Sequence, residues 1–257
     1  MLNFRNTNIV FIFLLITLIG YDVFYSLPFY IYIITAIVYS LLLFWGSYYV
    51  GSSFYFKIVC SAETDKKQIA ISFDDGPVNE HTPRILELLA EYKVQAAFFC
   101  IGKRVAENEG LLKQVHAAGH IIGNHSYSHD TWFDLFSANK MYDDLQMMDN
   151  AMEKAIGLKP KLFRPPYGVT NPNLKKAVSR GNYIPVGWNI RSLDTVITDE
   201  QKLLTKVTKA LKPGSVVLFH DTGKAIPAIL PAFIQQARDK GFEIIRLDKL
   251  LKLEPYV

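Results

Sequence analysis

The amino-acid sequence predicts an α/β protein whose strands form a distorted or incomplete (β/α) barrel, preceded by an N-terminal transmembrane helical hairpin. Residues 1–56 are almost entirely apolar and aromatic, and charged residues become frequent only from Lys57 onward. From Lys66, short β-prone runs alternate with amphipathic helical patterns, which is typical of a parallel sheet. No glycine-rich phosphate-binding loop follows the first predicted strand, which disfavours the alternative of an open doubly wound sheet.

Two apolar stretches, residues 8–27 and 29–50, flank Pro28, and each is close to the roughly 20 residues that a helix needs to cross a bilayer. Aromatic residues that favour membrane interfaces gather toward the ends of these stretches: Tyr21, Tyr25, Tyr30, Trp45, Tyr48 and Tyr49. A cleaved signal peptide would have a shorter apolar core and a small-residue cleavage site; a long apolar cap on a soluble core is the other alternative. We therefore predict a lipid-bilayer anchor at 1–56, a linker at 57–66 and a second domain at 67–257.

A hairpin places both of its ends on one side of the membrane. The flanks carry Arg5 and Lys57, whereas the connection between the two stretches carries no Lys or Arg. The positive-inside tendency taken alone favours both ends in the cytoplasm, but counts this small leave the side of the second domain open.

The charge balance argues against nucleic acid as a partner. Lys and Arg number 28 against 24 Asp and Glu, a net charge of +4, and the cations form only doublets such as Lys66-Lys67. This pattern is not a phosphate-binding stripe. The two cysteines, Cys60 and Cys100, have neither metal-type nor redox-type spacing, so we expect free thiols.

Seven apolar runs are predicted to be strands: 68–73, 94–101, 120–123, 161–163, 183–190, 215–219 and 242–247. Helices between them have recognisable starts. Thr82-Pro83 is expected to open one helix as N-cap and first-turn proline, and Asn171-Pro172 repeats this device in a helix that ends at Gly181. Ser137 is expected to cap a helix that ends at Gly157, and Thr198 to begin a fourth.

Polar residues recur where the predicted strands end. Asp74 and Asp75 end the first strand, His125 the third and Arg164 the fourth. Arg191 and Asp194 follow the fifth strand, and His220 and Asp221 end the sixth. In a parallel barrel these strand ends share one face, which is where barrel enzymes place their chemistry. Packing does not account for polar residues at five strand ends, so we predict a functional site there.

Three of these positions fit a metal ion. His125 and His129, spaced as H-x-x-x-H, can converge on one ion, and one carboxylate of the Asp74-Asp75 pair would complete a site of two histidines and one carboxylate. Each pair alone is more often an ordinary packing pair or a solvated turn; together, at adjacent strand ends, they favour a metal. Neighbouring aspartates point in different directions, so one can bind the ion while the other handles protons.

Other residues have both a functional and a plain interpretation. His220 could give a proton to a leaving group or be a hydrogen-bonded core histidine. Arg164 could pair with a carboxylate of the site, and the backbone at Tyr167 could donate to a developing oxyanion, or Arg164-Pro165-Pro166-Tyr167-Gly168 could be only a proline-rich turn. His81, His116 and His120 are expected to lie outside the site.

Four motifs resemble, in order and spacing, those of the polysaccharide deacetylase (NodB-homology) family. They are Ile71-Ser72-Phe73-Asp74-Asp75-Gly76-Pro77, His125-Ser126-Tyr127-Ser128-His129, Arg164-Pro165-Pro166-Tyr167-Gly168 and Leu218-Phe219-His220. The resemblance covers about residues 66–250 and implies an incomplete (β/α) barrel that binds one divalent ion, with zinc the expected one. Residues 67–257 would then be the catalytic domain.

The same resemblance implies a role for each matching residue. Asp75, His125 and His129 look like the metal ligands, Asp74 like the general base and His220 like the general acid. Arg164 is similar to the residue that orients the base. The substrate-binding residues expected are Tyr167 (through its backbone N–H), Leu218 (beside the acetyl methyl group), Pro166, Trp188, Asp194 and Arg191.

One motif departs from the family pattern, which often has Asp-x-x-Asp-Trp after a tryptophan, its first aspartate supporting the catalytic histidine. Here Arg191 stands in that aspartate's place, Asp194 is retained and Thr195 replaces the tryptophan. A cation beside His220 would lower the pKa of its imidazolium. Either Asp194 or another acid supports His220, or Arg191 has a different part in substrate binding.

The sequence thus predicts a multi-pass membrane protein, expected in a bacterial inner membrane, that hydrolyses N-acetyl groups of a cell-envelope or secreted glycan. The resemblance favours an extracytoplasmic catalytic domain. The alternatives are a membrane-tethered glycan-binding protein with a degenerate site, and a deacetylase for another amide or an O-acetyl ester. Protein partners are not predicted.

Overall fold

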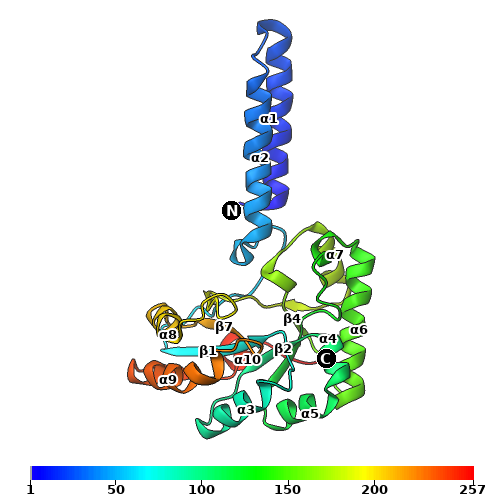
Figure 1. The fold of residues 1–257 in the computed structure, drawn as a ribbon. Coiled ribbons are helices and arrows are strands. Elements are labelled where there is room, and N and C mark those ends of the chain that lie inside the picture. Colours follow the sequence, from blue (N-terminus) through cyan, green and yellow to red (C-terminus); the bar gives the residue numbers. More distant parts are fainter. Residues whose placement is uncertain (1) are drawn as a thin grey trace.

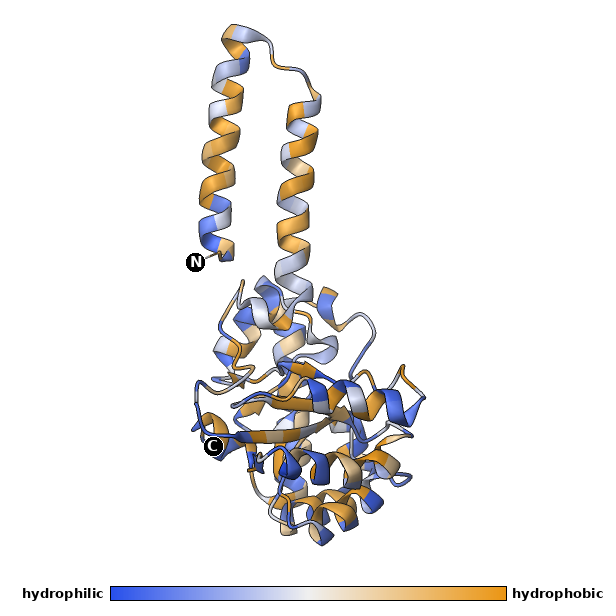
Figure 2. Cartoon of the chain, turned by 90° about the vertical axis from the view of Figure 1, so that its left-hand side faces the viewer, coloured by the Kyte–Doolittle hydropathy of each residue, from blue (hydrophilic) through white to orange (hydrophobic). Residues whose placement is uncertain are grey.

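Two long apolar helices project from one end of the folded domain in the computed structural model, which describes residues 2–257 (Figure 1). Helix α1 (Phe4–Tyr25) and helix α2 (Tyr30–Tyr48) lie side by side, and the Tyr39 hydroxyl of α2 donates to Asn8 Oδ1 of α1 at 2.8 Å. At 1.5 Å per residue, α1 is about 33 Å long, enough to cross a bilayer core. Figure 2 shows that both helices are predominantly apolar, and their side chains are largely exposed. The expected helical hairpin is present, and its insertion into a membrane stays a prediction.

The base of the hairpin is packed onto the domain. Phe54 fills the space beside Gly46 at the end of α2 so tightly that a Cβ on Gly46 would lie 2.3 Å from its ring. A 3-10 turn (η1, Val50–Ser52) follows α2, and the backbone N–H of Thr170 donates to the Ser47 carbonyl at 3.0 Å. The expected linker also lies on the domain, because Val59 pairs with Val186 in an isolated bridge.

Eight short strands form one parallel sheet in the spatial order β5-β4-β3-β2-β1-β7-β6, with β8 beside the start of β1. Their bounds are β1 Gln68–Asp74, β2 Ala97–Cys100, β3 Ile121–Asn124, β4 Leu162–Phe163, β5 Ile184–Pro185, β6 Ile190–Arg191, β7 Val216–His220 and β8 Glu243–Ile244. Within the described residues, the two outer strands β5 and β6 do not pair with each other. The prediction of an incomplete parallel barrel is confirmed.

Two strand predictions are wrong in extent. The run 183–190 is not one strand but two, β5 and β6, on opposite edges of the sheet. The chain departs from the sheet between them because the carbonyls of Val186 and Gly187 accept hydrogen bonds from the Arg164 guanidinium. The run 242–247 is a strand only at Glu243–Ile244, after which the chain enters helix α10 (Leu247–Leu251).

Helices cover the outside of the sheet (Figure 1): α3 Thr82–Glu91, α4 Gly102–Glu107, α5 Glu109–Ala117, α6 Ala138–Ile156, α7 Pro172–Arg180, α8 Glu200–Lys209 and α9 Ile226–Asp239. Short 3-10 turns, η2 (Phe133–Leu135) and η3 (Pro166–Gly168), lie in loops. The caps predicted at Ser137, Gly157 and Asn171 are confirmed. Thr82 is wrong as N-cap, since it is the first helical residue, and α8 is capped by Asp199 and not by Thr198.

Strand β1 divides its side chains between two faces, as the period of two requires. Ile69, Ile71 and Phe73 enter the main core beneath α3, α8 and α9, where Phe73 stacks on Phe98 with ring centroids 5.0 Å apart. Ala70 faces the opposite way, into a second cluster inside the curved sheet. Because Ser72 and Asp74 continue the Ala70 face, β1 delivers the Asp74 carboxylate to the inside of the barrel at its carboxyl end.

Candidate active site

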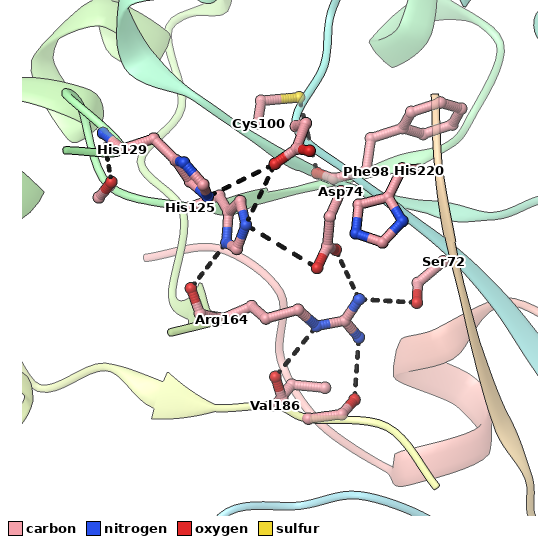
Figure 3. Close-up of polar contacts among 12 residues, drawn as sticks. Ser72, Asp74, Phe98, Cys100, His125, His129, Arg164, Val186 and His220 are labelled. Carbon is pink, nitrogen blue, oxygen red and sulfur yellow. Dashed lines mark hydrogen bonds and ion pairs between the residues drawn. The ribbon is translucent and has the colours of Figure 1, made fainter. Parts of the chain in front are cut away.

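Asp74 lies at the carboxyl end of β1 with its carboxylate almost fully buried, at 3% exposure. Its Oδ1 accepts a hydrogen bond of 2.6 Å from Nη1 of Arg164, and its Oδ2 lies 3.8 Å from Nε2 of His125 (Figure 3). One carboxylate oxygen is thus held by a cation from β4's end, while the other faces a histidine from the end of β3. This arrangement leaves Oδ2 available to interact with a third group between them.

Arg164 is the largest fully buried side chain of the domain, and every contact of its guanidinium serves to hold it in place. Nη1 donates to Ser72 Oγ at 2.8 Å as well as to Asp74, Nε donates to the Val186 carbonyl at 3.2 Å, and Nη2 donates to the Gly187 carbonyl at 2.9 Å (Figure 3). The guanidinium also lies 4.0 Å over the Phe99 ring. A planar fork with fixed donors can make this set of bonds, whereas an ammonium cannot. The Asp74 carboxylate is therefore oriented by a rigid partner.

Asp75, His125 and His129 bring three metal-type donors together. Asp75 Oδ1 lies 3.6 Å from Nε2 of His125 and 3.5 Å from Nε2 of His129, and the three donor atoms all lie within 4.8 Å of one another. Two imidazole nitrogens and one carboxylate oxygen are a donor set suited to zinc and other divalent ions, with positions left for water and substrate. The residues present therefore fit one divalent ion.

The protonation of these residues also suits a metal. Nδ1 of His125 lies 2.9 Å from the Arg164 carbonyl, which can only accept, so Nδ1 carries a proton and Nε2 is the ring nitrogen that faces Asp75. Burial and neighbouring His125 lower the pKa of His129 to about 4, against the opposing charges of Asp75 and Asp74. Burial raises the pKa of Asp75, but His125, His220, His129 and Arg104 outweigh it and lower that pKa overall. A neutral imidazole at His129 and an ionised carboxylate at Asp75 are the forms that bind a metal.

The backbone around the site adopts left-handed conformations at residues other than glycine. Asp75 has φ 77°, Ser126 φ 63°, His129 φ 45° and Tyr167 φ 58°. Such conformations cost roughly 1–3 kcal/mol each and persist where the surroundings fix them. Here they turn the Asp75 and His129 side chains toward one point.

His220 ends β7 opposite the metal-type cluster, and Asp194 supports it. Asp194 Oδ1 lies 2.7 Å from Nδ1 of His220, and Oδ2 accepts from the His220 backbone N–H at 2.7 Å. Burial lowers the pKa of His220, but the hydrogen bond and charge of Asp194, with Asp74 and Asp75, outweigh it and raise this pKa to about 9. Of the alternatives that Arg191 left open, the structure has Asp194 as the partner of His220, whereas the Arg191 side chain is exposed.

A pocket of about 190 Å³ joins these groups. It is lined by Asp74, Asp75, His125, His129, Pro165, Tyr167, Gly168, Trp188, Arg191, Thr195, Leu218 and His220. Tyr167, Trp188, Leu218 and Arg191, expected to bind substrate, are in this lining. Pro166 and Asp194 are not, because Pro166 is turned into the fold while Pro165 faces the pocket, and Asp194 is occupied by His220. A larger cavity, of about 540 Å³, lies away from this chemistry at the base of the hairpin.

The remaining histidines and cysteines lie outside the pocket lining. His120 Nδ1 accepts from the Ala96 backbone N–H at 3.1 Å, and burial lowers its pKa to about 4. His116 packs edge-on against Tyr256, and His81 lies 3.6 Å from Glu80. Cys60 and Cys100 are free thiols, as predicted.

Sequence reasoning gave no role to Asp221, which packs behind the Asp75-Gly76 segment of the site. Its Oδ2 accepts from the Thr82 hydroxyl at 2.6 Å, and a Cβ on Gly76 would lie 1.9 Å from this oxygen, so only glycine fits beside Asp75. Burial raises the pKa of Asp221 to about 7. Its position directly after His220 was the available signal. Ser72 was also missed, although it shares a strand face with Asp74.

An incomplete parallel barrel whose carboxyl face carries three histidines, two aspartates and a buried arginine indicates a hydrolase with a candidate metal site. Comparison with known proteins gives the family. Residues 61–186 match the family model described as "Polysaccharide deacetylase". The chain is similar to a peptidoglycan-N-acetylglucosamine deacetylase of Bacillus cereus, with 34% identity over 73% of this chain and 90% of the relative. This chain belongs to the polysaccharide deacetylase family.

Two further comparisons agree. A peptidoglycan-N-acetylmuramic acid deacetylase of Bacillus subtilis, PdaA, is 29% identical over 73% of each chain. The crystal structure of the Bc1960 peptidoglycan N-acetylglucosamine deacetylase superposes with a TM-score of 0.72 at 28% identity, covering 77% of this chain and 94% of that one. The predictions of family, fold and enzyme class are confirmed.

Replacing Asp194 by Asn is expected to change the pH dependence of activity. If His220 acts as an acid, activity falls as pH rises through its pKa, which Asp194 raises to about 9. Without that charge the fall in kcat/KM should move to lower pH by at least about one unit. The measurement is kcat/KM of the full-length variant as a function of pH. If kcat/KM of the variant falls at the same alkaline pH as in wild type, Asp194 does not set the pKa of the catalytic acid. Asp199→Asn, at the α8 cap, is the matched control.

Proposed function

We propose that this chain is a membrane-anchored, metal-dependent N-deacetylase that acts on N-acetylhexosamine units of the cell-wall glycan. The observation that carries the proposal is the single pocket in which Asp75, His125 and His129 face one another while Asp74 and His220 border the same space. Relatives that act on peptidoglycan support the substrate class.

Asp75, His125 and His129 would hold one divalent ion, and zinc suits two imidazoles with one carboxylate. When bound, the ion supplies Lewis-acid polarisation of the acetyl carbonyl and lowers the pKa of a water. Two residues next to these proposed ligands would hold them in place. The Arg164 carbonyl sets the His125 tautomer, and the Arg104 side chain donates to the Asp75 backbone carbonyl at 2.6 Å.

Asp74 would act as general base. Its Oδ1 is held by Arg164 and its Oδ2 faces the space beside His125, so Oδ2 is the atom that would take a proton from the attacking water. The water oxygen bonds to the acetyl carbon, and the resulting negative charge falls on the former carbonyl oxygen. The Tyr167 backbone, which has φ 58° and belongs to the pocket lining, would donate its N–H there.

His220 would act as general acid. Because Nδ1 is engaged by Asp194, Nε2 is the atom that would give a proton to the departing amine nitrogen. The carbon–nitrogen bond then breaks, releasing acetate and a free amino sugar. Leu218 would pack against the acetyl methyl group and Trp188 against the sugar.

The hairpin would anchor the enzyme in the membrane with both helix ends on the side of the catalytic domain. A cell-wall glycan substrate requires that side to be extracytoplasmic, against the weak charge bias of Arg5 and Lys57. A protease-protection assay on intact spheroplasts tests the side: cleavage within residues 57–257 by external protease is expected, and protection would place the domain inside.

Arg191 favours a second candidate substrate. It is exposed, lines the pocket and lies 5.9 Å from the Trp188 ring, so it presents a cation where a sugar would bind. N-acetylmuramic acid carries a carboxylate that N-acetylglucosamine lacks, and a relative acts on it. A charge-assisted bond to this carboxylate would give Arg191 a selective role.

Replacing Arg191 by Ala tests this candidate. If the deacetylated unit is N-acetylmuramic acid with a free carboxylate, kcat/KM on glycan strands freed of their peptides should fall about tenfold, with little change on N-acetylglucosamine oligomers. An equal fall in kcat/KM on both substrates would show that Arg191 does not recognise the carboxylate of N-acetylmuramic acid. Lys202→Ala on α8, outside the pocket, is the control.

Acetate release by the full-length protein tests the proposal as a whole. We expect chelator-sensitive acetate and new free amines from de-O-acetylated peptidoglycan or from N-acetylglucosamine oligomers. Glycan binding without acetate would indicate the degenerate glycan-binding protein, and faster acetate release from matched O-acetyl substrates would indicate an esterase.

A further inference from the structure

A second cavity lies where the hairpin meets the domain, and it shares no lining residue with the pocket of the proposed active site. It encloses about 540 Å³ between the start of α1 (Asn3, Phe4, Arg5), residues 53–58 and Lys175 of α7. Its floor is apolar and buried, formed by Phe54, Tyr55 and Ile58. The cavity therefore has an apolar floor of well-packed side chains.

Ring contacts and a backbone bond hold this cavity in shape. The Phe4 ring lies 6.1 Å from Phe54 and 5.1 Å from Tyr55, and the Phe4 backbone N–H donates to the Phe54 carbonyl at 2.9 Å. Phe54 in turn packs edge-on against Trp45 near the end of α2, with centroids 6.2 Å apart. Both helices of the hairpin thus fix the walls.

Every charged side chain in the lining is a cation. Arg5, Lys57 and Lys175 come from three separate segments, all three are exposed, and the lining contains no Asp or Glu. The Lys and Arg ion pairs recorded among residues 2–257 involve other residues, such as Lys154 with Glu109 and Arg246 with Asp248. Three cations without a partner carboxylate around an apolar floor suit a ligand that is both anionic and partly apolar.

The position of the cavity indicates where that ligand comes from. Figure 1 shows that the start of α1 (Phe4) and the end of α2 (Tyr48) adjoin the domain. Because residues 3–5 line the cavity, the cavity lies at this end of the hairpin. If the hairpin spans the bilayer, as the proposed function holds, this end lies at the level of the lipid headgroups. Trp45, Tyr48 and Tyr49 gather at the same level, as is usual for membrane interfaces.

We propose that this cavity binds the phosphate of an anionic membrane lipid, with Arg5, Lys57 and Lys175 around the phosphate and the acyl-proximal part of the lipid against Phe54 and Tyr55. The inference rests on the membrane insertion in the proposed function but not on the hydrolytic reaction. Such a lipid would join α1, residues 53–58 and α7, and so fix the height and tilt of the catalytic domain over the membrane.

The test measures lipid retention by the full-length protein purified in detergent, using native mass spectrometry. Phosphatidylglycerol, phosphatidylcholine and inorganic phosphate are offered at equal concentration. We expect one phosphatidylglycerol to be retained in preference to phosphatidylcholine. In the triple variant Arg5→Gln, Lys57→Gln, Lys175→Gln the apparent affinity should fall about 100-fold, since each basic residue near a membrane surface contributes roughly fivefold.

The triple variant Lys113→Gln, Lys209→Gln, Lys240→Gln is the matched control, because it removes three exposed cations from other parts of the domain and should retain the lipid. A melting temperature equal to wild type shows that each variant is folded. Equal retention of both lipids, or full retention by the first variant, would overturn the proposal. Complete displacement of the lipid by inorganic phosphate would also overturn it, by making free phosphate the ligand. Acetate release is measured separately, so loss of the proposed activity would not affect this result.

Discussion

The Asp74→Asn variant should lose about 10³-fold in kcat while it still binds one equivalent of metal. The substitution keeps the shape of the side chain but removes the charge that would accept the proton of the attacking water, and general base catalysis contributes on this scale. Asp74 is not among the three residues whose donor atoms lie together and could hold a metal ion. Single-turnover acetate release and metal content of the same full-length preparation give the two numbers.

The neighbouring residue supplies the control for this prediction. Asp75→Asn should lose metal and activity together, because Asp75 Oδ1 is the carboxylate oxygen that faces Nε2 of both histidines, at 3.6 and 3.5 Å. If instead Asp74→Asn releases the metal and Asp75→Asn retains it, the roles of the two aspartates are reversed.

The Arg164→Leu variant should be destabilised by about 3–5 kcal/mol, because it leaves the buried Asp74 carboxylate and the carbonyls of Val186 and Gly187 without a donor. For a domain of this size the melting temperature would fall by about 10 °C. Differential scanning calorimetry of the full-length protein measures the change.

Two further variants serve as controls for the Arg164→Leu result. Arg164→Lys keeps the charge but loses the fork that reaches four acceptors, so it should recover only part of the stability and little activity. Arg180→Leu, at the exposed end of α7, should remain within about 0.5 kcal/mol of wild type. Wild-type stability in Arg164→Leu would show that water replaces the guanidinium.

Local signals in the sequence predicted the elements whose ends depend on their own residues. Ser137 caps α6 with its side chain and Gly157 ends it in the left-handed region, and both effects act within one helical turn. Thr82 was expected to be a cap for the same reason. Its hydroxyl instead donates to Asp221, 139 residues away, a contact that no local pattern contains.

The predicted length of a strand was wrong where a distant side chain competes with the sheet for backbone hydrogen bonds. The run 183–190 has the composition of one strand, yet Arg164 takes two of its carbonyls and the chain turns between β5 and β6. Helices α4, α5 and α9 were not individually predicted, although the alternation that requires crossover connections was correct.

The candidate site could be located from sequence because parallel strands end on one face, so that Asp74, His125, Arg164 and His220 had to meet there. Which side chains of the site bond to each other was harder to predict from the sequence. Arg191 stands where the family often has an acid, and only the three-dimensional arrangement shows Asp194 bonded to His220. The sequence likewise did not predict that residues 50–62 pack on the domain, because the apolar anchor and the domain differ sharply in composition.

The central claim is that metal held by Asp75, His125 and His129 is required for deacetylation, and a metal titration tests it most directly. Full-length protein is stripped with a chelator, and zinc is added in steps while acetate release from N-acetylglucosamine oligomers or de-O-acetylated peptidoglycan is measured. The account predicts no activity in the stripped protein and a linear rise that ends at one equivalent, absent in His125→Ala. Full activity without metal, or an unchanged titration in His125→Ala, would contradict it.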